Sequence, residues 1–94
     1  MKNLLQVYTF FSDPGHAWLQ VPMAIIKQLK LSRMITPWSY KHNGFAYLEE
    51  DSDAGKFLDA WCQATNKTKE VFFKEYCIER YEENTSIRGY NPFC

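Results

Sequence analysis

The spacing of apolar positions changes along the chain, and the changes predict alternating strands and helices. Residues 4–11 are apolar on both faces of an extended chain and stop at Ser12-Asp13-Pro14-Gly15, which is typical of an interior strand followed by a turn. Residues 22–30 begin with proline and repeat isoleucine and leucine near helical spacing, which predicts a helix. Residues 38–41 and 45–48 flank His42-Asn43-Gly44, and this pattern predicts a tight antiparallel hairpin.

A second helix is predicted after the hairpin. Asp51 or Ser52 can cap it, an apolar stripe of Phe57, Leu58, Trp61 and Cys62 follows, and the helix should end near Asn66. Residues 71–78 fit either a helix or a strand, and their Val-Phe-Phe cluster favours a strand. Residues 82–94 are polar and contain glycine and proline, so we expect an irregular tail on the surface.

The element order β-α-β-β-α-β predicts a single α+β domain over residues 1–94. This order is the split βαβ pattern of ferredoxin-like domains, in which two helices cover one face of a four-stranded antiparallel sheet. A chain of 94 residues buries roughly 65% of its unfolded surface, which is enough for an independent core.

Strand alternation places Phe45 and Tyr47 on one side of the sheet and Ala46 and Leu48 on the other. We expect Ala46 and Leu48 to face the helices, which leaves an aromatic pair on the opposite face. Contiguous exposed aromatic patches are rare on monomers, so a partner, a second copy or the C-terminal tail should cover the pair.

The run from Gly44 to Leu48 resembles the middle of the RNP1 motif of the RNA recognition motif family. That resemblance implies base stacking on Phe45 and Tyr47, with Tyr8 or Phe10 beside them on the first strand. The acidic run of residues 49–51 follows at once and would repel a phosphate backbone. Binding of single-stranded nucleic acid through this aromatic face is therefore one alternative.

Charge and cysteine content narrow the class of protein further. The net charge is zero, because residues 1–48 carry five Lys/Arg against Asp13 and residues 49–94 carry six against ten Asp/Glu. Cys62, Cys77 and Cys94 are odd in number and form no C-x-x-C pair, which favours reduced thiols. The apolar runs are too short for a transmembrane helix, and the first residues lack a cleavage site, so we expect a cytoplasmic protein with no membrane partner.

The loop from Asp13 to Trp18 is a second candidate binding site. His16 near carboxylates is how a metal or acid-base site would begin, but no H-x-x-x-H, H-x-H or H-E-x-x-H spacing links the two histidines. We therefore assign no catalytic residue, no metal ligand and no cofactor, and keep a small metal-assisted enzyme around His16 as a further alternative.

A longer resemblance rests on segments 12–22, 46–54 and 86–90, which read SDPGHAWLQVP, AYLEEDSDA and SIRGY. These segments are similar to a family of small uncharacterised proteins encoded by bacteriophages, plasmids and bacteria, whose members commonly carry cysteine where Ser52 stands. The resemblance implies an accessory protein of a mobile element. Taken together, we expect a non-catalytic protein that binds a host macromolecule, most simply a protein, or that self-associates.

Overall fold

The computed structural model describes residues 3–94, so the first two residues of the predicted domain lie outside the described residues. Within that range one mixed sheet of six strands, in the order β5-β1-β2-β4-β3-β6, carries three α-helices. The strands are β1 (Tyr8–Ser12), β2 (Ala17–Pro22), β3 (Tyr40–His42), β4 (Phe45–Glu49), β5 (Cys77–Tyr81) and β6 (Asn91–Pro92). The helices are α1 (Met23–Gln28), α2 (Asp53–Thr65), α3 (Lys69–Glu75) and the short 3-10 helix η1 (Ser86–Gly89).

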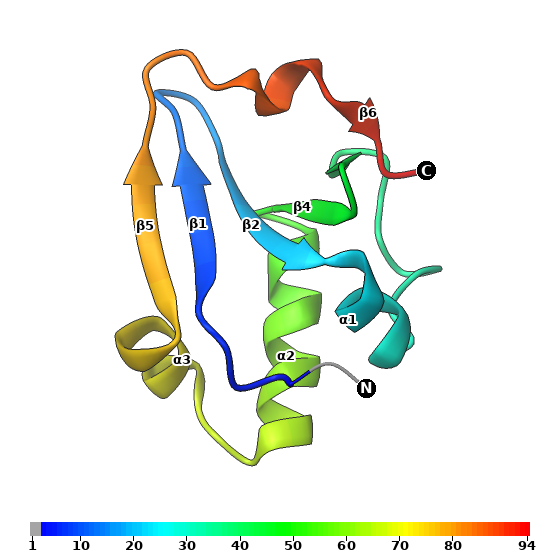
Figure 1. Ribbon diagram of the computed structural model, residues 1–94, viewed down its shortest axis with the longest axis vertical. Helices are drawn as coiled ribbons and strands as arrows, with labels where there is room; N and C mark the ends of the chain where they lie inside the picture. Colours follow the sequence, from blue (N-terminus) through cyan, green and yellow to red (C-terminus); the bar gives the residue numbers. More distant parts are fainter. Residues whose placement is uncertain (1–2) are drawn as a thin grey trace.

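The ferredoxin-like prediction is wrong, although the α+β class is correct. A ferredoxin-like sheet has four antiparallel strands and two helices, whereas here β5 pairs with β1 in parallel and the sheet has six strands. Figure 1 shows β5 and β1 side by side with their arrows in the same direction. Three segments account for the difference, namely Ala17–Pro22, Lys69–Glu75 and the short edge strand Asn91–Pro92.

The first of these segments is β2, which the sequence pattern did not reveal. The turn after β1 folds the chain back on itself, and Asp13 closes it because its Oδ1 accepts hydrogen bonds from the backbone N–H groups of Gly15 and His16 at 2.9 and 2.8 Å. Ala17–Pro22 then pairs antiparallel with both β1 and β4. The proline that suggested a helix start stands at the N-cap of α1, so strand and helix follow each other without a loop.

The second segment is α3, where a strand was favoured over residues 71–78. Thr68 caps this helix, because its side-chain oxygen accepts a hydrogen bond from the Val71 backbone N–H at 3.1 Å. Phe72 enters the core from α3 and is fully buried, whereas Phe73 is exposed. The strand predicted here begins later, at Cys77.

The central hairpin and the second helix agree with the sequence patterns. Asn43 and Gly44 both have positive φ, 50° and 82°, as a type I′ turn between β3 and β4 requires. Helix α2 begins after Ser52 and ends at Asn66 in the left-handed conformation. The tail of residues 82–94 is more ordered than expected, since it contains η1 and β6, and β6 pairs with β3.

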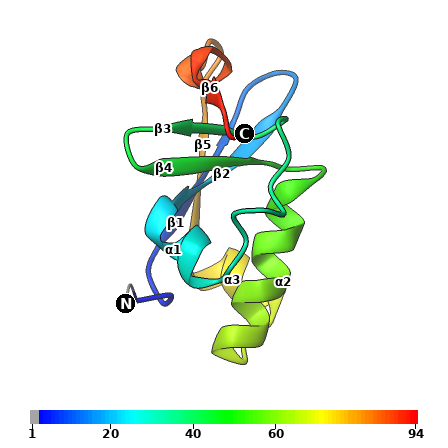
Figure 2. The ribbon, with the colours of Figure 1, turned by 90° about the vertical axis from the view of Figure 1, so that its right-hand side faces the viewer.

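The sheet separates two apolar clusters. On one side the helices cover the main core, where Ala46 and Leu48 of β4 pack with Phe57 and Trp61 of α2. On the other side, which we call the tail face, Trp18, Tyr47 and Ile87 are buried with Tyr90 packed against them. Figure 2 shows the helices below β3 and β4 and the orange-red 3-10 helix of the tail above them. The predicted orientation of Ala46 and Leu48 is confirmed, and among the expected covers it is the tail that lies over Tyr47.

Candidate functional site: an aromatic pocket on the tail face

A pair between Asp13 and Arg88 fixes one wall of a pocket. The Arg88 guanidinium donates from Nε to Oδ2 at 2.6 Å and from Nη2 to Oδ1 at 3.0 Å, a two-pronged contact that sets its plane. The hydrogen bonds from Arg88 hold the pKa of the Asp13 carboxyl well below its ordinary value; burial opposes them, and the backbone N–H groups of Gly15 and His16 assist. The β1–β2 turn is therefore joined to η1, 75 residues later in the chain.

Arg88 also contacts an aromatic ring. The guanidinium carbon lies 5.6 Å from the centre of the Trp18 ring, within the range of a cation–π contact. Thr85 positions η1 for this contact, since its hydroxyl accepts a hydrogen bond from the Ile87 backbone N–H at 3.2 Å. Trp18 itself is 2% exposed and lies opposite Glu49 in the pairing of β2 with β4.

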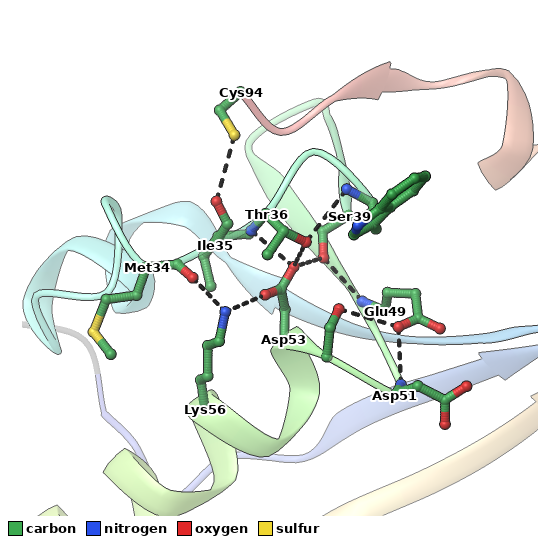
Figure 3. A network of polar contacts seen from close by, with 11 residues as sticks. Met34, Ile35, Thr36, Ser39, Glu49, Asp51, Asp53, Lys56 and Cys94 are labelled. Atoms are coloured by element: carbon green, nitrogen blue, oxygen red, sulfur yellow. Dashed lines mark hydrogen bonds and ion pairs between the residues drawn. The ribbon is translucent and has the colours of Figure 1, made fainter.

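A buried carboxylate at the start of α2 positions the opposite wall. Asp53 is fully buried, and its Oδ2 accepts hydrogen bonds from the Thr36 backbone N–H at 3.0 Å, the Thr36 hydroxyl at 2.7 Å and the Ser39 hydroxyl. Its Oδ1 pairs with Lys56 Nζ at 2.9 Å, as Figure 3 shows. Burial raises the pKa of Asp53, but the hydrogen bonds from Ser39, Lys56 and Thr36 together outweigh it and leave the pKa below its ordinary value.

This network holds Trp38 in place although Trp38 is not part of the core. The Thr36 hydroxyl accepts from the Trp38 backbone N–H at 3.3 Å, and the Ser39 hydroxyl accepts from the Glu49 backbone N–H at 3.0 Å. The loop is therefore tied both to α2 and to the end of β4 (Figure 3). The Trp38 residue between these anchors is 72% exposed, the most exposed of the large apolar residues described.

Glu49 supplies the acidic group of the site. One oxygen, Oε2, accepts hydrogen bonds from the Asp51 backbone N–H at 2.9 Å and from the Ser52 hydroxyl at 3.1 Å. The other oxygen, Oε1, accepts no hydrogen bond from residues 3–94, and Glu49 forms no ion pair within that range. This carboxylate therefore offers one acceptor oxygen, Oε1, toward the pocket.

These groups surround a pocket of about 350 Å³, a size typical of small-ligand sites. Its lining residues come from three separate parts of the chain, and they are His16, Trp18, Trp38, Tyr40, Glu49, Ser52 and Arg88. The Tyr40 ring meets the Trp18 ring edge-on with centroids 6.3 Å apart, and the His16 ring lies 6.0 Å from Trp18. The pocket is thus largely aromatic, with one acidic and one basic group at its wall.

The structure brings together the three predicted loop residues but divides the predicted sheet residues. Asp13, His16 and Trp18 all belong to the pocket or to the ion pair behind it. Among the four sheet candidates, Tyr8 and Phe10 pack on the helix side of the sheet.

The other two sheet candidates, Phe45 and Tyr47, pack on the tail face. Tyr47 is 6% exposed, and the ring of Tyr90 lies 5.1 Å from it. The hairpin histidine, His42, stacks on the same Tyr90 ring at 4.0 Å.

Sequence reasoning missed Arg88, Trp38 and Tyr40 as members of the site. Arg88 lies in SIRGY, a segment that was used only for its family resemblance, and an arginine after a turn carries no pairing information of its own. Trp38 stood at the start of the strand predicted over residues 38–41, so the pattern did not mark it as an exposed loop residue. Glu49 was predicted as a member of the acidic run of residues 49–51 and not as a wall of an aromatic pocket.

Across residues 3–94, no three His, Cys, Asp or Glu side chains lie close enough to hold a metal ion. None of the helices in that part of the chain has the length and apolar character needed to cross a membrane. No family model matches the chain, and no curated protein or solved structure shows a significant match to it.

Proposed function

We propose that this domain is a non-catalytic binding protein that holds one side chain of a partner protein in the aromatic pocket of the tail face. The observation that carries the proposal is the indole of Trp38, which is 72% exposed although the loop backbone on both sides of it is held by hydrogen bonds. Together with Trp18 and Tyr40 it forms an aromatic recess of about 350 Å³. The family resemblance of the sequence adds that the partner is a host protein.

Tryptophan is well suited to such a role. Residues whose truncation weakens protein complexes most are enriched in tryptophan, tyrosine and arginine, and they lie in pockets that exclude water. All three types line this pocket, as Trp38, Tyr40 and Arg88. Both walls are fixed before a ligand arrives, one by Asp13 and the other by Asp53, so little ordering opposes binding.

The geometry favours a protein partner over single-stranded nucleic acid. A stacked base needs an open ring face, but the tail packs over Tyr47. The exposed acidic residues Glu50 and Asp51 follow the pocket residue Glu49 in the chain, and they would repel phosphates. The recess around Trp38 does offer open aromatic surface.

The test is capture with a matched pair of variants. Wild type, Trp38→Ala and Tyr81→Ala are immobilised in turn, and proteins retained from bacterial lysate are identified and purified. Tyr81 is the control because it is a 62% exposed aromatic residue on β5 that is not part of the pocket. A purified partner should bind Tyr81→Ala as wild type and bind Trp38→Ala about 30-fold more weakly, which corresponds to about 2 kcal/mol.

Equal binding by all three proteins contradicts the proposal. Both substituted residues are exposed, so neither change should alter the free energy of unfolding by more than about 0.5 kcal/mol. That measurement separates loss of binding from loss of structure.

A further inference from the structure

We infer that the pocket selects an organic cation, namely an alkylammonium group such as the end of a lysine side chain. This inference rests on the proposed function, because it assigns the chemistry of the group that the same pocket receives. Three features of the site support it. They are the aromatic walls, the Glu49 carboxylate, which forms no ion pair within residues 3–94, and the Arg88 guanidinium, whose charge is balanced by Asp13.

The aromatic walls come first. Trp18, Trp38 and Tyr40 reach the pocket from β2, from the loop before β3 and from β3 itself. Faces of such rings carry negative electrostatic potential and attract cations, and alkylated ammonium groups are bound in cages of this kind. The molecule already uses this attraction once, since the Arg88 guanidinium lies over Trp18 at 5.6 Å.

The carboxylate of Glu49 supplies the charge that a bound cation would meet. It lines the pocket, forms no ion pair with residues 3–94, and leaves Oε1 without a hydrogen-bond donor from that range. The donors on Oε2 are an uncharged hydroxyl and a backbone N–H, so they orient the carboxylate without cancelling its charge. A cation in the pocket gains a charge-assisted contact that a neutral ligand lacks.

Arg88, the basic residue of the pocket, does not make the net charge of the pocket lining positive. Arg88 makes two hydrogen bonds to Asp13, whose carboxyl is kept ionised by them, so the pair carries no net charge. With that pair balanced and His16 counted as neutral at pH 7, Glu49 determines the net charge of the lining, which is negative. An anionic ligand would have to enter against this charge.

Titration of the wild-type protein, followed by proton–nitrogen correlation spectra, tests the inference. The three indole N–H signals report separately, because Trp18 and Trp38 line the pocket while Trp61 is buried in the core and donates from Nε1 to the Leu4 carbonyl at 2.9 Å. Choline chloride should shift the signals of Trp18 and Trp38 and leave that of Trp61 unchanged. The neutral isostere of choline, in which tert-butyl replaces trimethylammonium, should bind about 10-fold more weakly at equal ionic strength.

Two variants then separate charge from shape. Glu49→Gln keeps an oxygen for the Ser52 hydroxyl but removes the charge, and it should weaken choline binding about 10-fold. Glu50→Gln changes the adjacent exposed carboxylate and should leave the affinity within about twofold. An unchanged Trp61 signal shows that each variant is folded.

Several results would overturn the inference. They are equal affinity for choline and its neutral isostere, tighter binding of acetate than of choline, or no shift of Trp18 and Trp38 with either choline or acetyl-lysine-amide. The first two comparisons use wild type alone and do not depend on a variant folding.

The experiments distinguish the possible sources of the cation, and they test the proposed function independently of the cation inference. Tighter binding of acetyl-lysine-amide than of choline assigns the cation to a protein side chain, and the reverse order assigns it to a free amine, while both support the cation class. If a captured partner binds in a Trp38-dependent way but neither cation shifts the indole signals, the binding function stands and the cation inference fails. If choline binds as expected but no partner depends on Trp38, the cation inference stands and the proposed function fails.

Discussion

Replacing Asp53 with asparagine tests whether this buried carboxylate stabilises the loop that carries Trp38. The amide of Asp53→Asn can keep one oxygen in the position of Oδ2, facing the donors from Thr36 and Ser39. Its NH₂ group then faces Lys56 Nζ, so a donor meets a donor where an ion pair of 2.9 Å existed. The substitution therefore keeps the shape of the side chain and removes its charge.

The cost of Asp53→Asn follows from the number of donors. Hydrogen bonds to a charged acceptor contribute about 1.5 to 3 kcal/mol and those to a neutral one about 0.5 to 1.5. Three donors weakened by about 1 kcal/mol each, together with the lost Lys56 pair, are partly offset by the smaller cost of burying a neutral group. We expect the free energy of unfolding to fall by about 2 to 4 kcal/mol at neutral pH.

The pH dependence gives a second readout of the same substitution. Because the folded-state pKa of Asp53 is lowered, its contribution is complete above the unfolded value of about 3.9 and is lost as the pH falls below it. Urea unfolding at a series of pH values should show a shallower acid decline in Asp53→Asn than in wild type. Some decline should remain, since Asp13 also has a lowered pKa.

Asp51→Asn is the matched control, two residues earlier. Asp51 is exposed, and no residue within 3–94 donates a hydrogen bond to its carboxylate. Its free energy of unfolding should change by less than about 0.5 kcal/mol. A loss in Asp53→Asn of less than about 1 kcal/mol, or an acid decline as steep as that of wild type, would refute the role assigned to this carboxylate.

Three further predictions concern the turn, the tail and the ion pair. Gly44→Ala should lower the free energy of unfolding, measured with urea, by about 1 kcal/mol because the φ of Gly44 is +82°. Gly55→Ala, at an open position in α2, should raise it by up to about 1 kcal/mol. Changes of the same sign in the two variants would contradict this. Phe45→Ser combined with Tyr47→Ser should leave the main core folded but release η1, seen as faster tryptic cleavage after Arg88, and global unfolding would place the pair in the main core instead. Asp13→Asn removes a carboxyl whose pKa is lowered, so its stability should decline less steeply than that of wild type below about pH 4, and identical acid limbs would count against the pairing with the guanidinium.

The elements that the sequence predicted correctly are those determined by residues close together in the chain. The Asn43-Gly44 pair determines its hairpin through two positive φ values, and the apolar stripe of α2 and its end at Asn66 are visible in the sequence. For residues 69–75, Thr68 was an available capping signal that was outweighed by the β-favouring cluster at residues 71–73. A strand was thus predicted where a capped helix forms.

The arrangement of the sheet and the pocket depends on contacts that are distant in sequence. Whether the chain after the Asp13 turn returns as a strand depends on pairing with β1 and β4, and the second partner lies more than 20 residues later. Parallel pairing of β5 with β1 likewise joins residues about 70 positions apart. The loop residues Asp13, His16 and Trp18 could be selected as a group, but their partner Arg88 and the exposed Trp38 could not be assigned to the same recess from spacing alone.

The position of β5 and β6 at opposite edges of the sheet has a consequence for synthesis of the protein. Both edges are built from the last part of the chain, with β5 beside β1 and β6 beside β3. The ring of Phe93 completes the helix-side core, since it is 7% exposed. On the ribosome, the hairpins and helices up to residue 75 can form early, but the sheet cannot close until residue 93 has left the exit tunnel. Such non-local closure gives a high contact order and slow folding, so we expect the nascent chain to expose its strand edges to chaperones until residue 93 is outside the tunnel.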